Sequence, residues 1–408
     1  MNIKLQKSSI KEESSIQITG SKSESNRLLL LQALYPEIKI ENVSNSDDSQ
    51  LMTKALASSA QEIDIHHAGT AMRFLTAYFA IQNKREKLIS GSKRMKERPI
   101  KILVDALNQL GADVSYKENE GFPPLLIKGK QLTKHKVSLD ANVSSQYISA
   151  LLLIASKLEN GLELTLKGKI TSVPYINMTL SLLTQLNIET EFKNNIITVK
   201  PLQEKMKPKT LTVESDWSSA SYFYSIVALA KIGTVISISS YKKNSLQGDS
   251  ALANIYKSFG VATTFKENTV LIKKTAKVDS KTTIDFDLAN SPDIAQTISV
   301  TAFALGLESN LTGLHTLKIK ETDRLEALKT EIEKLGGQVK ITNESLHLSP
   351  SKNIIENVVV STYNDHRMAM AFAPLALKTP IEIEDYKVVS KSYPTFWDDL
   401  KQLGFQTN

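Results

Sequence analysis

Residues 332–339 read Ile332-Glu-Lys-Leu-Gly-Gly-Gln-Val339, where an apolar helical pattern ends at glycine and an extended stretch follows. The same pattern occurs at Leu107-Asn-Gln-Leu-Gly-Ala-Asp-Val114, Leu183-Thr-Gln-Leu-Asn-Ile-Glu-Thr190, Tyr256-Lys-Ser-Phe-Gly-Val-Ala-Thr263 and Leu400-Lys-Gln-Leu-Gly-Phe-Gln-Thr407. The turn residues Gly111, Asn187, Gly260, Gly336 and Gly404 are 76, 73, 76 and 68 residues apart. Glycine and asparagine accept the left-handed conformation that ends many helices. We therefore predict five helix ends of one kind.

The near-regular spacing indicates a repeated unit of the fold. A period of roughly 70 residues is too long for a solenoid repeat, and it has room for two helices and several short strands such as Leu125-Leu-Ile-Lys128. A chain of 408 residues also exceeds one ordinary core. The pattern therefore predicts repeated α/β units folded into two domains. Pro201 to Lys209, with three lysines and two prolines, is the predicted interior linker.

The composition is typical of a globular protein that binds anions. Hydrophobic residues make up 41% and charged residues 23% of the chain, and the net charge is +7. A basic balance favours nucleic acid or phosphorylated small molecules as partners. The absence of cysteine excludes disulfides, thiolate metal sites and a cysteine nucleophile. The first eight residues read as a strand rather than a signal peptide, and the longest apolar run, Tyr147 to Ala155, is too short for a membrane span. We expect a cytoplasmic protein without membrane contact.

The segment Lys320-Glu-Thr-Asp-Arg324 stands just before a helical pattern that begins at Leu325. Thr322 or Asp323 is the predicted N-cap, which places Arg324 in the first turn. The helix dipole disfavours a cation there by roughly 0.3 to 1 kcal/mol, so a negative group should lie beside it. Lys320 and Glu321 remain in the preceding loop. The arrangement predicts an anion site with acid chemistry beside it.

Four more predicted helices begin beside an arginine. The expected starts are Ser23 or Ser25 as cap before Arg27, Thr70 as cap with Arg73 at the third helical position, Pro99 as first helical residue after Arg98, and Asn364 or Asp365 as cap before Arg367. One such arginine is ordinarily a solvated side chain. Five together indicate anion binding, because helix N–H groups and guanidinium donors both suit phosphate and carboxylate. There is no phosphate-binding loop motif for a nucleotide.

Other polar positions have a structural and a functional interpretation. Asp293 opens a predicted helix, where a carboxylate stabilises the helix by itself, and Ser144-Ser-Gln146 suits capping or binding equally. The six histidines lack metal-ligand spacing, so we expect no metal site. The cationic segment Lys84 to Arg98 has no aromatic residues for stacking bases, and we expect no nucleic-acid partner.

Taken in order, eleven motifs resemble the enolpyruvyl transferase family, and most closely the branch that acts on shikimate 3-phosphate. They are Gly20-Ser-Lys-Ser-Glu-Ser-Asn-Arg27, Ala68-Gly-Thr-Ala-Met-Arg73, Arg94-Met-Lys-Glu-Arg-Pro99, Ser144-Ser-Gln146, Pro174-Tyr175, Ser218-Ser-Ala-Ser-Tyr-Phe223, Asn244-Ser-Leu-Gln-Gly-Asp249, Pro292-Asp293, Lys320-Glu-Thr-Asp-Arg324, Tyr363-Asn-Asp-His-Arg-Met-Ala-Met370 and Lys391-Ser-Tyr-Pro394. The resemblance covers nearly the whole chain.

The resemblance implies a mixed α/β (α+β) fold of two similar lobes, each with three repeated βαβαββ units, and an active site in the interlobe cleft. It assigns residues 1–21 and 214–408 to the C-terminal lobe, which the N-terminal strand completes. Residues 22–213 would form the inserted N-terminal lobe.

The implied reaction transfers the enolpyruvyl group of phosphoenolpyruvate to the 5-hydroxyl of shikimate 3-phosphate and releases phosphate, with no cofactor. The implied shikimate 3-phosphate site is Lys22, Ser23, Arg27, Ser144, Ser145, Gln146, Ser172, Tyr175, Asp293 and Lys320. The implied phosphoenolpyruvate site is Lys22, Gly69, Arg98, Gln146, Arg324, His366, Arg367 and Lys391. The implied catalytic groups are Glu321, which exchanges a proton with C3 of the enolpyruvyl group, and Asp293, which acts as base or orients the hydroxyl, with Lys22 sharing that role. We expect a monomer.

The sequence departs from the family pattern at Phe74, where proline is usual, at His67, where asparagine is usual, and at Val173 and Thr316. The family is the target of glyphosate, so we expect an altered response to that inhibitor. A sister transferase acting on UDP-N-acetylglucosamine is the nearest rival, but it typically relies on a cysteine that this chain lacks. A basic nucleic-acid-binding protein on a related fold is the rival from another class.

Overall fold

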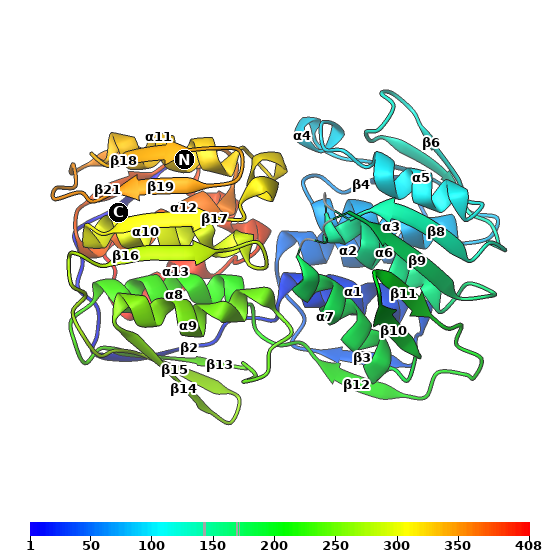
Figure 1. The fold of residues 1–408 in the computed structure, drawn as a ribbon, viewed down its shortest axis with the longest axis horizontal. Helices are drawn as coiled ribbons and strands as arrows, with labels where there is room; N and C mark the ends of the chain where they lie inside the picture. The colour runs from blue at the N-terminus through cyan, green and yellow to red at the C-terminus, as the bar shows by residue number, and fades with distance from the viewer. Residues whose placement is uncertain (142–143, 169, 171) are drawn as a thin grey trace. The chain divides into compact units, whose positions relative to one another are not determined.

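The computed structural model describes residues 1–141, 144–168, 170 and 172–408 (Figure 1). The chain divides into two compact units: residues 1–20 with 214–408, called unit 1, and residues 21–213, called unit 2. Both units mix helices and strands, so the predicted α/β class is confirmed. The predicted linker at Pro201 to Lys209 lies inside unit 2, between its last two strands, and that prediction is wrong. Lysine and proline mark an exposed loop, which need not be a domain boundary.

Unit 2 consists of two four-stranded sheets, one strand pair and seven helices among its described residues. Its elements are α1 Lys22–Leu34, β3 Ile38–Glu41, α2 Asp47–Ala57, β4 Glu62–Asp64, α3 Gly69–Ala80, β5 Glu86–Ser90, α4 Lys93–Lys96, α5 Lys101–Gln109, β6 Asp113–Tyr116, β7 Leu125–Lys128, β8 Lys136–Asp140, α6 Ser145–Ala155, β9 Leu162–Lys167, α7 Val173–Gln185, β10 Thr190–Lys193, β11 Ile196–Val199 and β12 Lys209–Thr212.

Unit 1 is built from two four-stranded sheets and one three-stranded sheet. Its strands are β1 Ile3–Leu5, β2 Glu13–Ile16, β13 Val235–Ser239, β14 Val261–Lys266, β15 Thr269–Lys274, β16 Thr283–Asp287, β17 Glu308–Thr312, β18 Gln338–Ile341, β19 Leu346–Ser349, β20 Val358–Val360 and β21 Ile381–Ile383. Its α-helices are α8 Trp217–Leu229, α9 Leu252–Ile255, α10 Ala295–Leu305, α11 Arg324–Lys334, α12 His366–Phe372 and α13 Phe396–Leu403. Short 3-10 turns lie at Gly248–Ala251, Tyr256–Phe259, Pro292–Ile294, His315–Ile319, Ala373–Leu377 and Tyr386–Lys391.

One strand arrangement recurs in every four-stranded sheet. The orders are β4-β5-β7-β6 and β10-β11-β9-β8 in unit 2, and β14-β15-β13-β2 and β16-β17-β19-β18 in unit 1. In each sheet two strands pair in parallel, and an antiparallel hairpin continues the sheet. A helix connects the parallel strands in three of these sheets, whereas the connection from β2 to β13 contains all of unit 2 before α8. The repeated helix ends in the sequence thus correspond to a repeated βαβαββ order.

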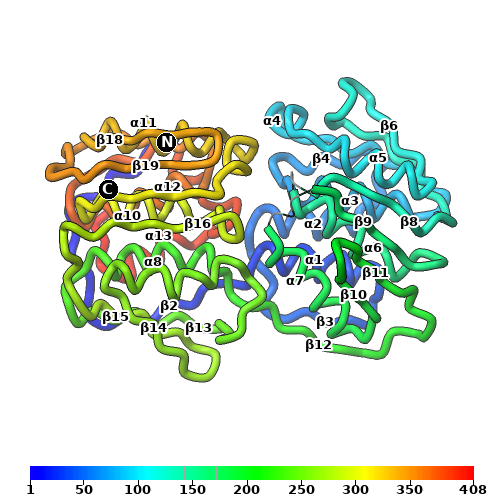
Figure 2. The backbone as a smooth tube through the Cα atoms, viewed as in Figure 1, coloured from blue at the N-terminus to red at the C-terminus, as the bar shows by residue number. Residues whose placement is uncertain are grey.

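The first strand of the chain, β1, pairs with the last one, β21. β1 pairs antiparallel with β21, and Leu5 bridges Thr407, so both termini belong to unit 1 (Figure 2). The predicted N-terminal strand is therefore confirmed.

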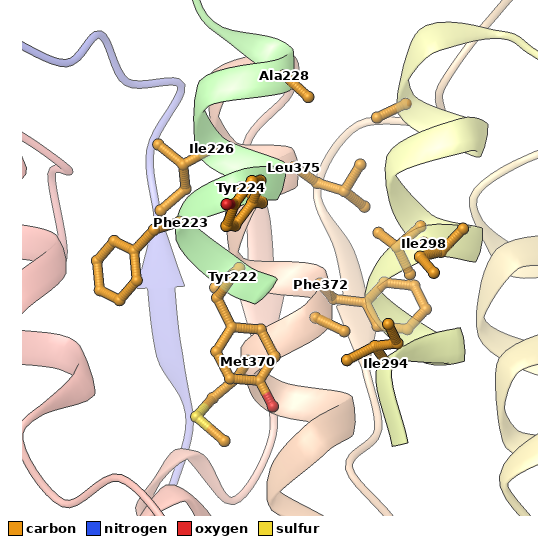
Figure 3. Packing of buried hydrophobic residues seen from close by; sticks show 14 of the residues in the cluster. Tyr222, Phe223, Tyr224, Ile226, Ala228, Ile294, Ile298, Met370, Phe372 and Leu375 are labelled. Carbon is orange, nitrogen blue, oxygen red and sulfur yellow. The ribbon is translucent and has the colours of Figure 1, made fainter. Parts of the chain in front are cut away.

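Three buried helices fill the core of unit 1. α8, α10 and α12 contact one another, and their side chains Tyr222, Ile298 and Phe372 are fully buried (Figure 3). Nearly every residue of these helices is buried, as expected of helices that lie among other elements. Since the three pack in contact, the polar residues at their first turns are brought into one neighbourhood.

The five predicted helix ends have the expected backbone. Gly111, Asn187, Gly260, Gly336 and Gly404 have φ values of 101°, 61°, 71°, 96° and 116°. All five lie in the left-handed region that favours glycine and asparagine, so this prediction is confirmed. The end of α2 is different, because its C-cap Ser58 has a φ of −75° and makes no left-handed turn.

Replacing Gly111 with alanine should lower the free energy of unfolding by about 1 kcal/mol. No atom lies within 4 Å of a methyl group placed there, so backbone strain alone sets the cost. Gly111→Asn should cost clearly less, because asparagine occupies the equivalent turn at position 187. Urea unfolding of both variants measures the difference, and equal costs would contradict this explanation.

Candidate functional site

Arg324 is the centre of a charged cluster on unit 1. It is the first residue of α11, after the N-cap Asp323, whose side chain accepts from Leu325 and Glu326 N–H. Its guanidinium is 2% exposed and donates to Asp365 Oδ2 (2.6 Å), Asp293 Oδ1 (2.8 Å) and Glu321 Oε2 (2.8 Å). The negative charge expected beside this helix start is present, and the protein itself supplies it.

Asp293 forms ion pairs with three cations. Its Oδ1 lies 2.8 Å from Arg324 Nη1 and 3.5 Å from Lys320 Nζ, and its Oδ2 lies 3.4 Å from Arg367 Nη2. Burial alone would raise the pKa of Asp293, but Lys320, Arg367 and Arg324 outweigh it and hold that pKa well below its usual value. Burial opposes the charge of Arg324 too, yet Asp365, Glu321 and Asp293 raise its pKa above the ordinary value. Asp293 is therefore ionised at neutral pH.

The start of α12 adds a second arginine to the same cluster. Asp365 is the N-cap and accepts from Arg367 N–H (2.9 Å), as predicted for this position. Arg367 Nη1 donates to the Asp293 carbonyl (3.2 Å), and Nη2 donates to Ser218 Oγ (3.2 Å). His366 is 1% exposed, with Nδ1 3.6 Å from Asp365 Oδ1. Lys391 Nζ donates to the Asn364 carbonyl (2.8 Å).

A buried carboxylate holds the loop that leads to α12. Glu331, on α11, accepts from Tyr363 Oη (2.5 Å), Lys334 Nζ (2.8 Å) and Ser361 N–H (3.2 Å). Tyr363 and Asn364 have φ values of 54° and 56°, a conformation that needs such support. Glu331 therefore ties α11, which carries Arg324, to the loop before Arg367.

On unit 1 the structure brings together all the site residues predicted there: Asp293, Lys320, Glu321, Arg324, His366, Arg367 and Lys391. Sequence reasoning missed the contributions of Asp365, Ser218 and Asp249. Each lies inside a motif that had been singled out, but Asp365 was considered only as a helix cap.

Unit 2 has its own set of polar groups at helix starts. Ser144 caps α6 by accepting from Gln146 N–H, and Gln146 Nε2 donates to Thr70 Oγ1 at the start of α3 (3.3 Å). Lys22, the first residue of α1, lies 3.4 Å from Asp48 Oδ2. Helices α1, α3 and α6 contact one another, so Lys22 and Gln146 belong to the same group of helices.

Arg98 lies against the backbone of Gly69. A methyl group at Gly69 would lie 2.9 Å from Arg98 Nη2 and still closer to Nη1. Arg98 is 8% exposed, and its Nε has no hydrogen-bond partner among the described residues. The missing side chain at Gly69 therefore lets the guanidinium approach the start of α3.

Arg27 is buried and uses its donors within the protein. It donates to Thr179 Oγ1 (2.8 Å), Ser149 Oγ (3.0 Å) and the carbonyls of Ser23 (2.7 Å) and Tyr175 (3.3 Å). Burial lowers its pKa to about 10. Arg27 thus joins α1, α6 and α7, while Ser172 is the residue before α7, and Ser145 is the first residue of α6.

Three predicted helix starts are wrong by two to four residues. α1 begins at Lys22 after Ser21, α3 begins at Gly69 after Ala68, and α5 begins at Lys101 after Ile100. Arg27 and Arg73 therefore lie in the second turn, and Pro99 precedes its helix. Arg73 donates to the carbonyls of Gly69 and Pro99, which fixes the backbone beside Arg98. Serine and threonine fit the first turn as well as the cap, so the pattern does not locate the boundary.

The structure shows where the four positions that depart from the family pattern lie. Phe74 is fully buried, and the Arg27 guanidinium lies 5.5 Å from its ring centre. His67 Nδ1 lies 2.8 Å from Ser92 Oγ. Thr316 Oγ1 is buried without a partner among the described residues, and Val173 is the first residue of α7.

The described part of the chain contains no group of three or more His, Cys, Asp or Glu residues that would hold a metal ion. Across the same residues, no helix is both long and apolar enough to cross a membrane.

A family profile described as EPSP synthase (3-phosphoshikimate 1-carboxyvinyltransferase) matches residues 56–400. The chain belongs to the EPSP synthase family. Among EPSP synthase relatives, a 3-phosphoshikimate 1-carboxyvinyltransferase of Bacteroides fragilis is 46% identical over 398 residues, with 96% of each chain covered. The enzyme of that name from Haemophilus influenzae is 36% identical over 423 residues, also with 96% coverage of each chain. A solved EPSP synthase from Acinetobacter baumannii has the same fold, with a TM-score of 0.80 over 100% of this chain and 99% of that chain at 18% identity.

Proposed function

We propose that this chain transfers the enolpyruvyl group of phosphoenolpyruvate to the 5-hydroxyl of shikimate 3-phosphate and releases phosphate, a step in the biosynthesis of chorismate and the aromatic amino acids. The observation that carries the proposal is the 46% identity to a 3-phosphoshikimate 1-carboxyvinyltransferase over 96% of both chains. The charged cluster around Arg324 fits a reaction between two anions, because it combines cations with carboxylates that can move protons.

We propose that shikimate 3-phosphate binds polar groups from both units. Those of unit 2 are Lys22, Ser23, Arg27, Ser144, Ser145, Gln146, Ser172 and Tyr175. Those of unit 1 are Asp293 and Lys320. Serine hydroxyls and cations suit the phosphate group, and the ionised Asp293 suits a sugar-like hydroxyl as acceptor.

Phosphoenolpyruvate would contact a second, overlapping set of groups. We assign to it Lys22, Gly69, Arg98 and Gln146 from unit 2, and Arg324, His366, Arg367 and Lys391 from unit 1. Lys22 and Gln146 serve both substrates. The two units would then be the two lobes of the family, residues 1–21 with 214–408 and residues 22–213, and each would hold half of the site.

In the proposed mechanism the 5-hydroxyl attacks C2 of phosphoenolpyruvate while C3 gains a proton. Glu321 in its protonated form donates that proton, and the hydroxyl proton passes to Asp293, a role that Lys22 shares only in its neutral form, and from there to the departing phosphate. Glu321 then takes a proton back from C3, the C2–O bond to phosphate breaks, and the double bond is restored. Arg324, Arg367 and Lys391 stabilise the charge on the leaving phosphate.

The proposal is tested by phosphate release from the purified protein. Release should require both phosphoenolpyruvate and shikimate 3-phosphate, with an enolpyruvyl ether as the second product. Release with either substrate alone, or none with both, would contradict it. The monomeric state and the cytoplasmic location stay predictions, which gel filtration with light scattering and cell fractionation would test.

Replacing Gly69 with alanine should raise the KM for phosphoenolpyruvate by about tenfold or more, equivalent to about 1.4 kcal/mol. The new methyl group would push the Arg98 guanidinium away from the start of α3. Arg98 is flexible enough to move, so the fold should survive. Steady-state kinetics give the KM. Gly168→Ala is a control for the loss of a glycine, because it adds backbone strain at a φ of 76° but no contact within 4 Å. An unchanged KM would exclude Arg98 from this site.

A further inference from the structure

Asp249 is a buried carboxyl next to the charged cluster that the proposed mechanism does not use. It lies in the 3-10 turn Gly248–Ala251 and is 2% exposed. Its Oδ2 is in close hydrogen-bond contact with Ser218 Oγ, and its Oδ1 has no partner among the described residues. The same Ser218 hydroxyl accepts from Arg367 Nη2 (3.2 Å). One hydroxyl therefore separates Asp249 from an arginine assigned to the substrate.

Asp249 and Asp293 share Arg367 unequally. Asp293 has direct contacts with Arg324, Lys320 and Arg367. No cation lies within salt-bridge distance of Asp249 among the described residues. Two carboxyls near one guanidinium do not both keep a charge at equal cost, and the better-paired one stays ionised. Asp249 is thus the member of the pair that accepts a proton.

The charges around Asp249 support this division. Asp293 faces it from the turn before α10, Arg367 from α12, and Asp216 from the N-cap of α8. Burial and the repulsion from Asp293 raise the pKa of Asp249 to about 7, against the opposing effects of Arg367 and the Ser218 hydroxyl. Asp293 has its pKa lowered in the same cluster. Such a pair, with pKa values moved apart, divides the acid and base roles.

We infer that Asp249 is a proton-carrying positioning residue, which orients Ser218 toward Arg367 and takes up a proton when an anionic substrate binds beside that arginine. The inference rests on the proposed function, since it needs phosphoenolpyruvate at Arg367. A bound phosphate or carboxylate adds negative charge to a cluster that already holds ionised Asp293. Protonation of Asp249 removes the negative charge that would repel the bound anion. The Arg367 guanidinium is then shared only between Asp293 and the ligand.

The sign of the pH dependence follows. Below about pH 7 Asp249 already carries its proton and binding requires no uptake. Above about pH 7 the proton must come from solvent, so the affinity for the anion falls as pH rises. If the ligand raises the pKa of Asp249 by about one unit, the affinity falls up to about tenfold between pH 6 and pH 8.5.

The test is calorimetric titration of the whole protein with phosphoenolpyruvate, the substrate assigned to Arg367, at pH 7.5 in two buffers of different ionisation enthalpy. We expect the wild type to take up about half a proton more than Asp249→Asn on binding. The asparagine mimics the protonated acid. The affinity of Asp249→Asn for the substrate should therefore change less than about twofold between pH 6 and pH 8.5 through this site. Asp285→Asn, an exposed carboxylate of the same unit, should behave as wild type.

Ser218→Ala provides a second test. Loss of the hydroxyl removes a donor that lowers the pKa of Asp249, so the decline in affinity should begin at higher pH than in the wild type. Equal proton uptake in the wild type and Asp249→Asn would overturn the inference while the proposed function stands. An unmoved decline in a folded Ser218→Ala would overturn it as well. No binding of phosphoenolpyruvate to the wild type would overturn the proposed function, and this inference with it.

Discussion

Replacing Glu321 with glutamine should lower kcat by about 100- to 10,000-fold. An amide has nearly the same shape as the carboxylate, but it does not give a proton to C3 or take one back. Its oxygen can still accept from Arg324 Nη2, which now lies 2.8 Å from Glu321 Oε2. Shikimate 3-phosphate binding should therefore stay within about threefold of wild type, because the hydrogen bond to Arg324 is kept. Phosphate release measures kcat, and calorimetry measures binding.

Glu326→Gln is the matched control for this prediction. Glu326 lies in the first turn of the same helix, but its side chain is exposed. The same chemical change there should leave kcat within about twofold of wild type, since surface substitutions usually have small effects. Full activity of Glu321→Gln would remove Glu321 from the proton-transfer role, whatever Glu326→Gln does.

Features decided by local backbone chemistry were predictable from the sequence. Gly111 and Asn187 mark left-handed helix ends because few other residues accept that conformation. Asp323 and Asp365 were predicted caps, and both side chains accept from N–H groups of the next turn. Each of these features depends on atoms within four residues along the chain.

The partners of the buried arginines were not predictable from the residue pattern. Arg324 meets Asp365, which lies 41 residues away in sequence, and Arg27 meets Thr179, which lies 152 residues away. A local pattern shows that a cation stands near a helix start, but only the fold determines which carboxylate reaches it. For the same reason Asp249 stayed unassigned, since its role depends on Ser218 and Arg367 from two other helices.

Replacing Arg324 with alanine should lower the free energy of unfolding at neutral pH by about 3 to 5 kcal/mol, beyond any effect on phosphoenolpyruvate binding. The side chain is 2% exposed, and its loss leaves Asp365, which is fully buried, and Asp293 without their closest cation. Lys329→Ala on the same helix breaks only an exposed pair with Glu333, and should cost less than about 1 kcal/mol. Denaturant unfolding of the two variants measures both costs.

The pH dependence identifies uncompensated charge as the cause of this loss. In the wild type the pKa of Asp293 is depressed, so its contribution to stability is complete above its unfolded pKa of about 3.9 and is lost as pH falls through the folded value. Without Arg324 that depression is smaller, so the difference in stability between wild type and Arg324→Ala should stay constant above about pH 4 and shrink as pH falls below it. Adding Asp365→Asn should recover at least about 1 kcal/mol, because asparagine still caps α12 but carries no charge. Strictly additive losses in the double variant would show instead that Arg324 stabilises the fold by packing alone.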